Sequence, residues 1–88
     1  MSDQSEVTPK LTPKELESLR FIRAYIALHG YAPSIPDVAR EASVSFTVAR
    51  GRLQSLQRKG YVSRARHRAR SIVPLRDEAG LLIQPLSA

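Results

Sequence analysis

Two segments of the chain carry the same helix-start signal, and together they fix where helices begin. Thr12-Pro13-Lys14-Glu15 and Ser34-Ile35-Pro36-Asp37 each place a hydroxyl residue three positions before an acidic one, with a proline in the first turn. In such a capping box the two side chains accept hydrogen bonds from each other's backbone N–H groups, and proline is tolerated because its missing N–H would have no helical partner. The sequence therefore predicts helices that start after Thr12 and after Ser34.

Apolar residues follow both signals at helical spacing. The predicted first helix ends near His29, because Gly30 supplies a left-handed residue. Its apolar face is expected to comprise Leu16, Leu19, Ile22 and Ile26, widened by Phe21, Tyr25 and Leu28. A short second helix over 35–42 turns inward Ile35, Val38, Ala39 and Ala42.

A third helix is predicted over 46–59, after a tight turn at 43–45. Ser45 is its expected N-cap, and Gly60 ends it. The residues expected to face the core recur with a period of about 3.6 residues and are Phe46, Ala49, Leu53 and Leu56. Two helices joined by so short a turn have helix-turn-helix spacing.

The pattern changes to that of β-strands after Gly60. Segments 61–63 and 71–73 are rich in Val, Ile and Tyr, and a basic segment separates them, so they predict a hairpin with a basic tip. The expected fold is mainly α with a small β wing: a winged helix-turn-helix with a three-helix core plus a C-terminal β-hairpin. We expect this domain over 11–75, a disordered arm over 1–10, and a tail over 76–88 that is an extra strand, a dimer contact or a disordered segment.

Charge is unevenly distributed along the chain. Between Ala42 and Arg76 there are nine basic residues and no acidic one. A domain with one purely cationic part is typical of proteins with a polyanionic partner. A basic surface kept for solubility is the simpler alternative, but solubility does not require every acid to be excluded from so long a stretch. Double-stranded DNA is the expected partner.

Other function classes find little support in the composition. The absence of cysteine excludes disulfides and thiolate metal sites and fits a cytoplasmic protein. His29 and His67 are isolated, so no metal site is expected. No stretch is apolar enough to span a membrane, and no catalytic or phosphate-loop motif occurs. We therefore expect no enzyme, no cofactor and no small-molecule ligand.

In a helix-turn-helix pair the second helix enters the major groove of DNA, N-terminal half first. The outward residues near the start of the third helix are Ser45, Thr47, Val48, Arg50, Gly51 and Arg52. Serine and threonine can hydrogen-bond to bases or phosphates, valine can contact a thymine methyl group, and arginine can donate two hydrogen bonds to one guanine. Glycine in a helix interior costs roughly 0.5–1 kcal/mol relative to alanine. Gly51 therefore serves either close packing or close approach of DNA, and the sequence does not decide between the two.

The predicted wing carries a second set of candidate contacts. Arg64, Arg66, Arg68 and Arg70 alternate along the chain, so in an extended wing they share one side. Guanidinium groups so arranged fit phosphates or a narrow minor groove. His67 lies in the same loop and joins this set as an exposed residue. A flexible basic loop without a fixed role is the alternative.

A series of local motifs recurs in a fixed order from Leu11 to Leu75. It consists of Leu11-Thr12, then Leu19 and Ile22, Gly30-x-x-Pro33-Ser34, Asp37-Val38-Ala39 and Leu53-x-x-Leu56-x-Arg58-Lys59-Gly60-Tyr61-Val62. This stretch resembles the N-terminal DNA-binding domain of LexA-type repressors. The resemblance implies a three-helix core with a two-stranded wing, which binds a two-fold symmetric operator as a dimer.

Three features depart from the family pattern. The turn before the third helix is one residue shorter. Arg50-Gly51 stands where the best-known members have acidic residues, so a different operator is expected. The 88 residues do not include the family's self-cleaving domain, so Ala79-Gly80, which echoes the family's cleavage site, is interpreted as a turn.

We therefore expect a sequence-specific transcription regulator, in particular a repressor of bacterial or phage type that acts at the nucleoid. An accessory or architectural DNA binder with weak sequence preference is one alternative. A winged-helix module that docks an acidic protein is another. The acid-free stretch favours nucleic acid over a protein partner, and a homodimer on a symmetric operator is the assembly that the resemblance implies.

Overall fold

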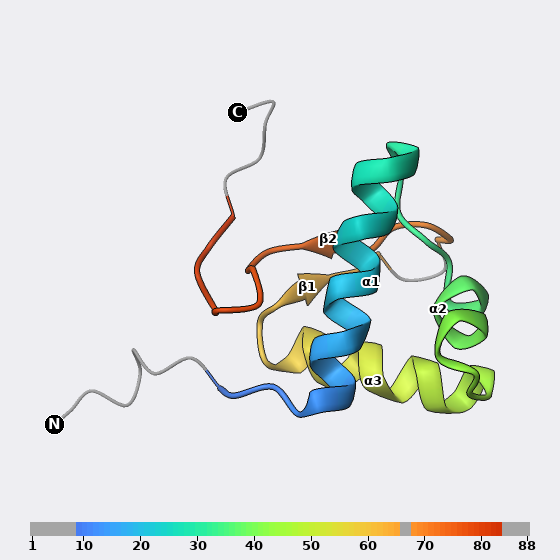
Figure 1. The fold of residues 1–88 in the computed structure, drawn as a ribbon, viewed down its shortest axis with the longest axis horizontal. Coiled ribbons are helices and arrows are strands. Elements are labelled where there is room, and N and C mark those ends of the chain that lie inside the picture. The colour runs from blue at the N-terminus through green and yellow to red at the C-terminus, as the bar shows by residue number, and fades with distance from the viewer. Residues whose placement is uncertain (1–8, 66–67, 84–88) are drawn as a thin grey trace, which may run out of the picture.

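A computed structural model describes residues 9–65 and 68–83. Within these residues the chain forms the helices α1 (Pro13–His29), α2 (Ile35–Ala42) and α3 (Phe46–Arg58), followed by the strands β1 (Val62–Ser63) and β2 (Val73–Pro74) (Figure 1). This architecture confirms the winged helix-turn-helix. No helix in the described part of the chain is long and apolar enough to cross a membrane.

Both capping boxes form as predicted. The Glu15 N–H donates to Thr12 Oγ1 over 3.1 Å, and the Thr12 N–H donates to Glu15 Oε1 over 2.9 Å. At the start of α2, the Asp37 N–H donates to Ser34 Oγ over 3.2 Å and the Ser34 N–H to Asp37 Oδ2 over 3.0 Å. Gly30 ends α1 with a φ of 83°, in the left-handed region that favours glycine.

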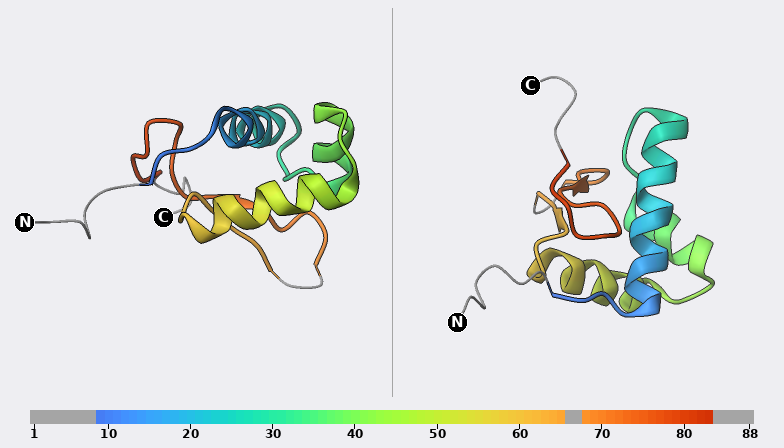
Figure 2. Two further views of the ribbon diagram at one scale, coloured as in Figure 1. Left: turned by 90° about the horizontal axis from the view of Figure 1, so that it is seen from below. Right: turned by 60° about the vertical axis from the view of Figure 1, so that its left-hand side comes forward.

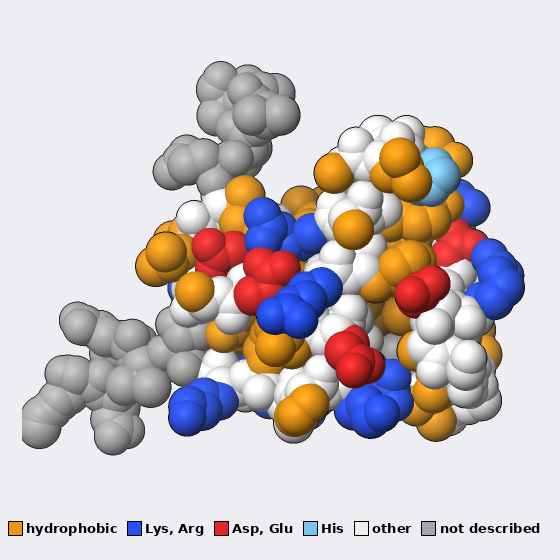
Figure 3. Space-filling view, viewed as in Figure 1, with side chains coloured by type: hydrophobic (Ala, Val, Ile, Leu, Met, Phe, Trp, Pro, Cys, Tyr) orange, Lys and Arg blue, Asp and Glu red, His pale blue; other side chains and the backbone are white. Residues whose placement is uncertain are grey.

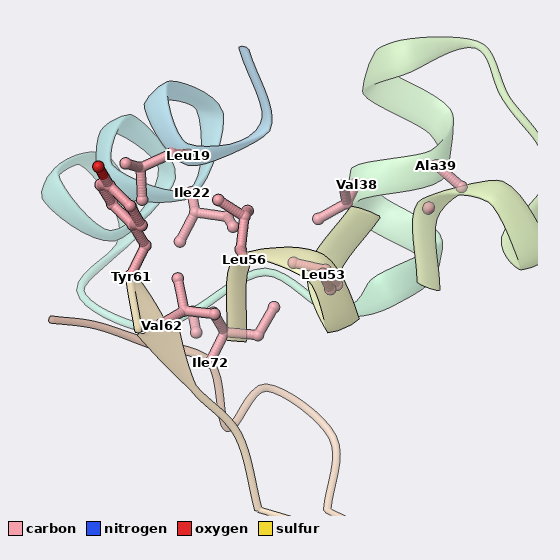
Figure 4. Close-up of a cluster of buried hydrophobic side chains, with 11 residues drawn as sticks. Leu19, Ile22, Val38, Ala39, Leu53, Leu56, Tyr61, Val62 and Ile72 are labelled. Carbon is pink, nitrogen blue, oxygen red and sulfur yellow. The ribbon is translucent and has the colours of Figure 1, made fainter. Parts of the chain in front are cut away.

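The core lies where the three helices meet the base of the sheet (Figure 4). Leu19 and Ile22 of α1 and Leu53 and Leu56 of α3 are fully buried. Other elements complete the cluster, including Val38 and Ala39 of α2, Tyr61, Val62 and Ile72. The inward faces predicted for the three helices are therefore confirmed in their central turns.

Two residues predicted to face the core lie at the surface instead. Leu28 is 79% exposed, because the last turn of α1 extends beyond α2 and α3 (Figure 1). Phe46 is 50% exposed at the first position of α3. Helical side chains point toward the helix N-terminus, so a residue in the first turn reaches past the end of the helix and away from its packed face.

The sheet is shorter than predicted and begins later in its second strand. β1 and β2 are antiparallel, with Val62 opposite Pro74 and Ser63 opposite Val73. Ile72, which was expected in the second strand, instead belongs to the core. After β2 the chain makes a turn over 77–80 and returns, so that Arg76 forms an isolated antiparallel bridge with Leu82.

The turn predicted at Ala79-Gly80 is confirmed. The Gly80 N–H donates to the Asp77 carbonyl over 2.9 Å, and Gly80 has a φ of 89°. Arg23 of α1 holds this turn through an ion pair with Glu78 at 2.5 Å. The tail was expected to be an extra strand, a dimer contact or a disordered segment. Residues 76–83 favour the first of these, since they form a turn and an isolated β-bridge. Residues 84–88 lie outside the described residues, as do 1–8 of the predicted N-terminal arm.

Candidate nucleic-acid interface

The first turns of α3 bring most of the predicted major-groove residues to one exposed surface. Ser45 is the N-cap, and its Oγ accepts a hydrogen bond from the Val48 N–H over 3.2 Å. Thr47, Val48 and Arg50 are exposed. The helix cannot rotate to hide them, because Ala49, Leu53 and Leu56 on its opposite face are fully buried. Arg52, which completes the predicted set, is only half-buried on the flank of the helix.

Gly51 is exposed on the same surface, and nothing in the described part of the chain explains its lack of a side chain. Among the residues that the structure describes, none would lie within 4 Å of a Cβ atom placed on Gly51. Its backbone does not have the positive φ that would demand glycine. Packing against the described residues therefore does not account for glycine at this position, and close approach of DNA stays a prediction.

In the described part of the β1–β2 connection, the Ser71 side chain bonds the backbone of Ala65 and Arg68. Ser71 Oγ accepts from the Ala65 N–H over 3.0 Å and donates to the carbonyl oxygens of Ala65 and Arg68 at 3.2 and 2.9 Å. Arg68 is exposed on this loop, and Arg64 is half-buried. The predicted contacts Arg66 and His67 lie outside the described residues.

The expectation that four arginines share one side of an extended wing is wrong for Arg70. Arg70 has a φ of 55°, so the chain is not extended there. Its Nη1 instead turns back to the helices, where it lies 3.1 Å from Tyr25 Oη, the Ala32 carbonyl oxygen and Asp37 Oδ2. The guanidinium also lies 5.1 Å from the centre of the Tyr31 ring, within cation–π range. Arg70 thus attaches the end of the wing to α1 and α2.

Charges around this attachment stabilise each other's ionised forms. The pKa of Asp37 falls from 3.8 to about 2, mainly because its carboxylate accepts the Ser34 backbone N–H, with further lowering from Ser34 Oγ, Arg70 and Arg40. The pKa of Arg70 is raised, first by its hydrogen bond to Tyr25. Asp37 therefore caps α2 and anchors the wing at once. The capping signal predicted only the first of these roles, because Arg70 lies far along the chain.

A second cluster sets the position of α3 against α1. Ser55 Oγ donates to Glu15 Oε2, and Lys59 Nζ donates to Glu15 Oε1 over 2.7 Å. Burial alone would raise the pKa of Glu15, but hydrogen bonds from Lys59, Ser55 and the Thr12 backbone lower it from 4.5 to about 2. Lys59 also donates to the Lys10 carbonyl over 2.8 Å. This cationic residue of the acid-free stretch is thus engaged inside the protein.

The exposed side of α3 and the wing lie on the same side of the molecule. Figure 2 (left) shows the β1–β2 connection extending past α3 on the side away from α1. The opposite face, which carries α1, has acidic and basic side chains interspersed (Figure 3). Within the described residues no group of three His, Cys, Asp or Glu side chains is placed to hold a metal ion.

Comparisons with known proteins point to one family. Residues 8–71 match the family described as LexA DNA binding domain. The chain is 44% identical over 71 residues to the LexA repressor of Pseudothermotoga lettingae, which covers 80% of this chain and 35% of that protein. It is 36% identical over 74 residues to the LexA repressor of Thermosipho melanesiensis, covering 84% of this chain and 37% of the relative.

The chain spans about a third of the length of the curated relatives that it matches. The LexA repressor of Geobacter metallireducens is 38% identical over 64 residues, which are 72% of this chain and 32% of that protein. In each case the shared part covers most of the helices and sheet described above. This chain belongs to the LexA DNA binding domain family.

Proposed function

We propose that this chain binds double-stranded DNA in a sequence-specific manner and represses transcription. The observation that carries the proposal is the exposed first half of α3, which presents Thr47, Val48 and Arg50. It lies within a stretch of the chain that has nine basic residues and no acidic one. Membership of the LexA DNA binding domain family supports it. The site of action is then the cytoplasm, at the nucleoid.

α3 reads the bases in this proposal. Its N-terminal half enters the major groove, where Arg50 forks onto a guanine and Val48 meets a thymine methyl group. The Ser45 hydroxyl accepts the Val48 N–H, which leaves its own O–H free to donate to a phosphate oxygen. Thr47 bonds a base or a phosphate. Gly51 lets the DNA approach the helix backbone closely, and Arg52 contacts the groove edge.

The wing holds the sugar–phosphate backbone. Arg68 is exposed on the described loop and, unlike Arg70, is not tied to the helices in the described structure, and Arg64 lies at the start of the loop. Arg66 and His67 stay predicted contacts of the same loop. A phosphate carries charge but no sequence information. The wing residues therefore supply affinity for DNA, and α3 supplies sequence specificity. Two copies bind a two-fold symmetric operator, one copy on each half-site.

Selection of random duplexes by the purified chain tests this function. We expect an enriched sequence with two inverted halves whose centres are about 10 base pairs, or a multiple of this, apart. If no sequence is enriched and all duplexes bind equally well, the chain is not a sequence-specific repressor, and an architectural role is the better account. If the chain binds no DNA even at low salt, the remaining hypothesis is a winged-helix module that docks an acidic protein.

A further inference from the structure

Phe46 is an aromatic residue that the fold leaves at the surface. It is the first residue of α3 and is 50% exposed. Its neighbours Ser45 and Thr47 are both exposed, and Val48, on the same turn, is 44% exposed. Single apolar side chains are common on protein surfaces and need no explanation by themselves. The surroundings of Phe46 are what give it a role.

Phe46 lines a hollow between α3, the start of α2 and the wing. Arg64 and Arg68 contribute to the lining on the wing side, and Ile35 and Pro36 contribute from α2. The ring thus lies between the turn of α3 that faces the major groove and the arginines assigned to the phosphates. Both flanks attract DNA, and the exposed ring offers no hydrogen bond to it. An apolar group on the DNA is the partner that suits such a surface best.

We propose that Phe46 reads thymine through its 5-methyl group. This inference rests on the proposed function, because it requires α3 in the major groove. The thymine methyl is the apolar group that B-DNA presents there, and phenylalanine is among the side chains suited to contact it. Removing the methyl group and half of the ring surface from water favours the complex without any hydrogen bond. Phe46 is therefore a specificity-determining residue.

Thymine-to-uracil replacement in the selected operator measures this contact in the wild-type protein. Uracil lacks only the 5-methyl group, so base pairing and backbone stay the same. We expect at least one thymine in each half-site at which uracil weakens binding by about four-fold, the value for one methyl-sized group returned to water. An operator with no methyl-dependent position overturns the proposal.

Three variants assign the methyl dependence to a side chain. In Phe46→Ala, uracil and thymine should bind equally at that position, and in Phe46→Leu most of the preference should remain. Val48→Ala is the matched control: it removes an apolar side chain from the same turn and should keep the preference at the Phe46 position. Melting temperatures of all three variants check that the fold is intact.

The outcomes separate this inference from the proposed function. If no duplex is enriched in the selection, the proposed function itself fails. If an operator is found but no thymine position loses its methyl dependence in Phe46→Ala while keeping it in Val48→Ala, the assignment to Phe46 is wrong. A Phe46→Ala variant that loses affinity equally for operator and random duplexes would place the ring on the sugar–phosphate backbone, which also overturns the proposal. If Phe46→Ala melts well below the wild type, binding is measured at a temperature at which this variant is still folded, and the same outcomes apply.

Discussion

At Gly51, the proposed contact with DNA and the stability of α3 favour different residues. Glycine weakens a helix because it loses more backbone freedom on folding than other residues do. The space around its Cα is open, so alanine would fit without a clash. A stabilising residue is therefore available at this position, and the proposed contact with DNA is the reason for glycine.

The Gly51→Ala variant tests that conflict. We expect its free energy of unfolding to rise by about 0.5–1 kcal/mol, from helix propensity alone, while its affinity for the selected operator falls. Urea denaturation and binding titrations measure the two effects on the same preparation. A variant that is less stable than the wild type would show that Gly51 is required for packing after all.

Glu15 links three segments through one carboxylate, and its ionisation contributes to stability. Its pKa in the folded protein is about 2, against an ordinary value of 4.5. Because the folded-state pKa is the lower one, the contribution is complete above about pH 4.5 and is lost as the pH falls toward 2. Glu15→Gln should lower the free energy of unfolding at pH 7 by about 1–3 kcal/mol, since the partly buried donors Ser55 and Lys59 lose a charged acceptor.

The pH dependence of that difference is the sharper test. Denaturation at pH 7, 5, 3 and 2 should show the gap between wild type and Glu15→Gln narrowing below pH 4.5. Asp37 also titrates in this range, but both proteins contain it, so its contribution cancels in the difference between their free energies of unfolding. Glu17→Gln is the matched control, because Glu17 is exposed two residues further along α1. A gap that stays constant down to pH 2 would mean that the Glu15 charge is not what stabilises the cluster.

At the scale of elements, the wing contains two arginines with different tasks. Arg70 is tied to α1 and α2, and Arg68 is exposed on the loop. We expect Arg68→Ala to keep the melting temperature, to weaken operator and random DNA alike and to reduce the salt slope of binding by about 1, as a lost phosphate contact does. Arg70→Ala should lower the melting temperature and weaken binding without changing the salt slope.

The two variants control for each other, since both remove one guanidinium from the same loop. Titrations at several salt concentrations, with thermal melts alongside, distinguish them. If Arg70→Ala reduces the salt slope and leaves the melting temperature unchanged, Arg70 contacts a phosphate, as the sequence predicted.

α3 is expected to behave as the reading element. Thr47→Ala and Arg50→Ala should cost roughly 1–3 kcal/mol on the selected operator and relax the choice of base at one position. Affinity for random duplexes should fall less, because the wing still holds the backbone. The comparison requires the same salt concentration throughout. If these variants lost only general affinity while the Arg68 variant lost specificity, a wing arginine that reads groove shape would be the better account.

At the scale of the whole molecule, one small core holds the DNA-facing elements together. Leu56 of α3 is fully buried, and its side chain points toward α1 and β1 (Figure 4). Leu56→Ala should lower the free energy of unfolding by about 2–5 kcal/mol, a large share of the stability of so small a domain. Thermal and urea melts measure this. A variant with an unchanged melting temperature would mean that the buried face of α3 is wrongly assigned.

Much of this fold follows from local signals. Capping boxes bond residues three positions apart, so Thr12 and Ser34 mark the helix starts without reference to the rest of the chain. The period of Leu53 and Leu56 likewise identifies the buried face of α3. Once the buried face is known, the opposite face of α3 is predicted to be exposed. It carries Thr47, Val48 and Arg50, and all three are exposed in the structure.

The sequence by itself thus determined the helix limits, the central buried faces and the separation of charge, because these depend on neighbours within a few residues or on composition. Only the tertiary structure decided that Phe46 and Leu28 lie outside the core, since a periodic face says nothing of where the covering element ends. It also decided that Arg70 turns back to Asp37, 33 residues away. Contacts of that kind depend on how whole elements pack, and no local pattern encodes them.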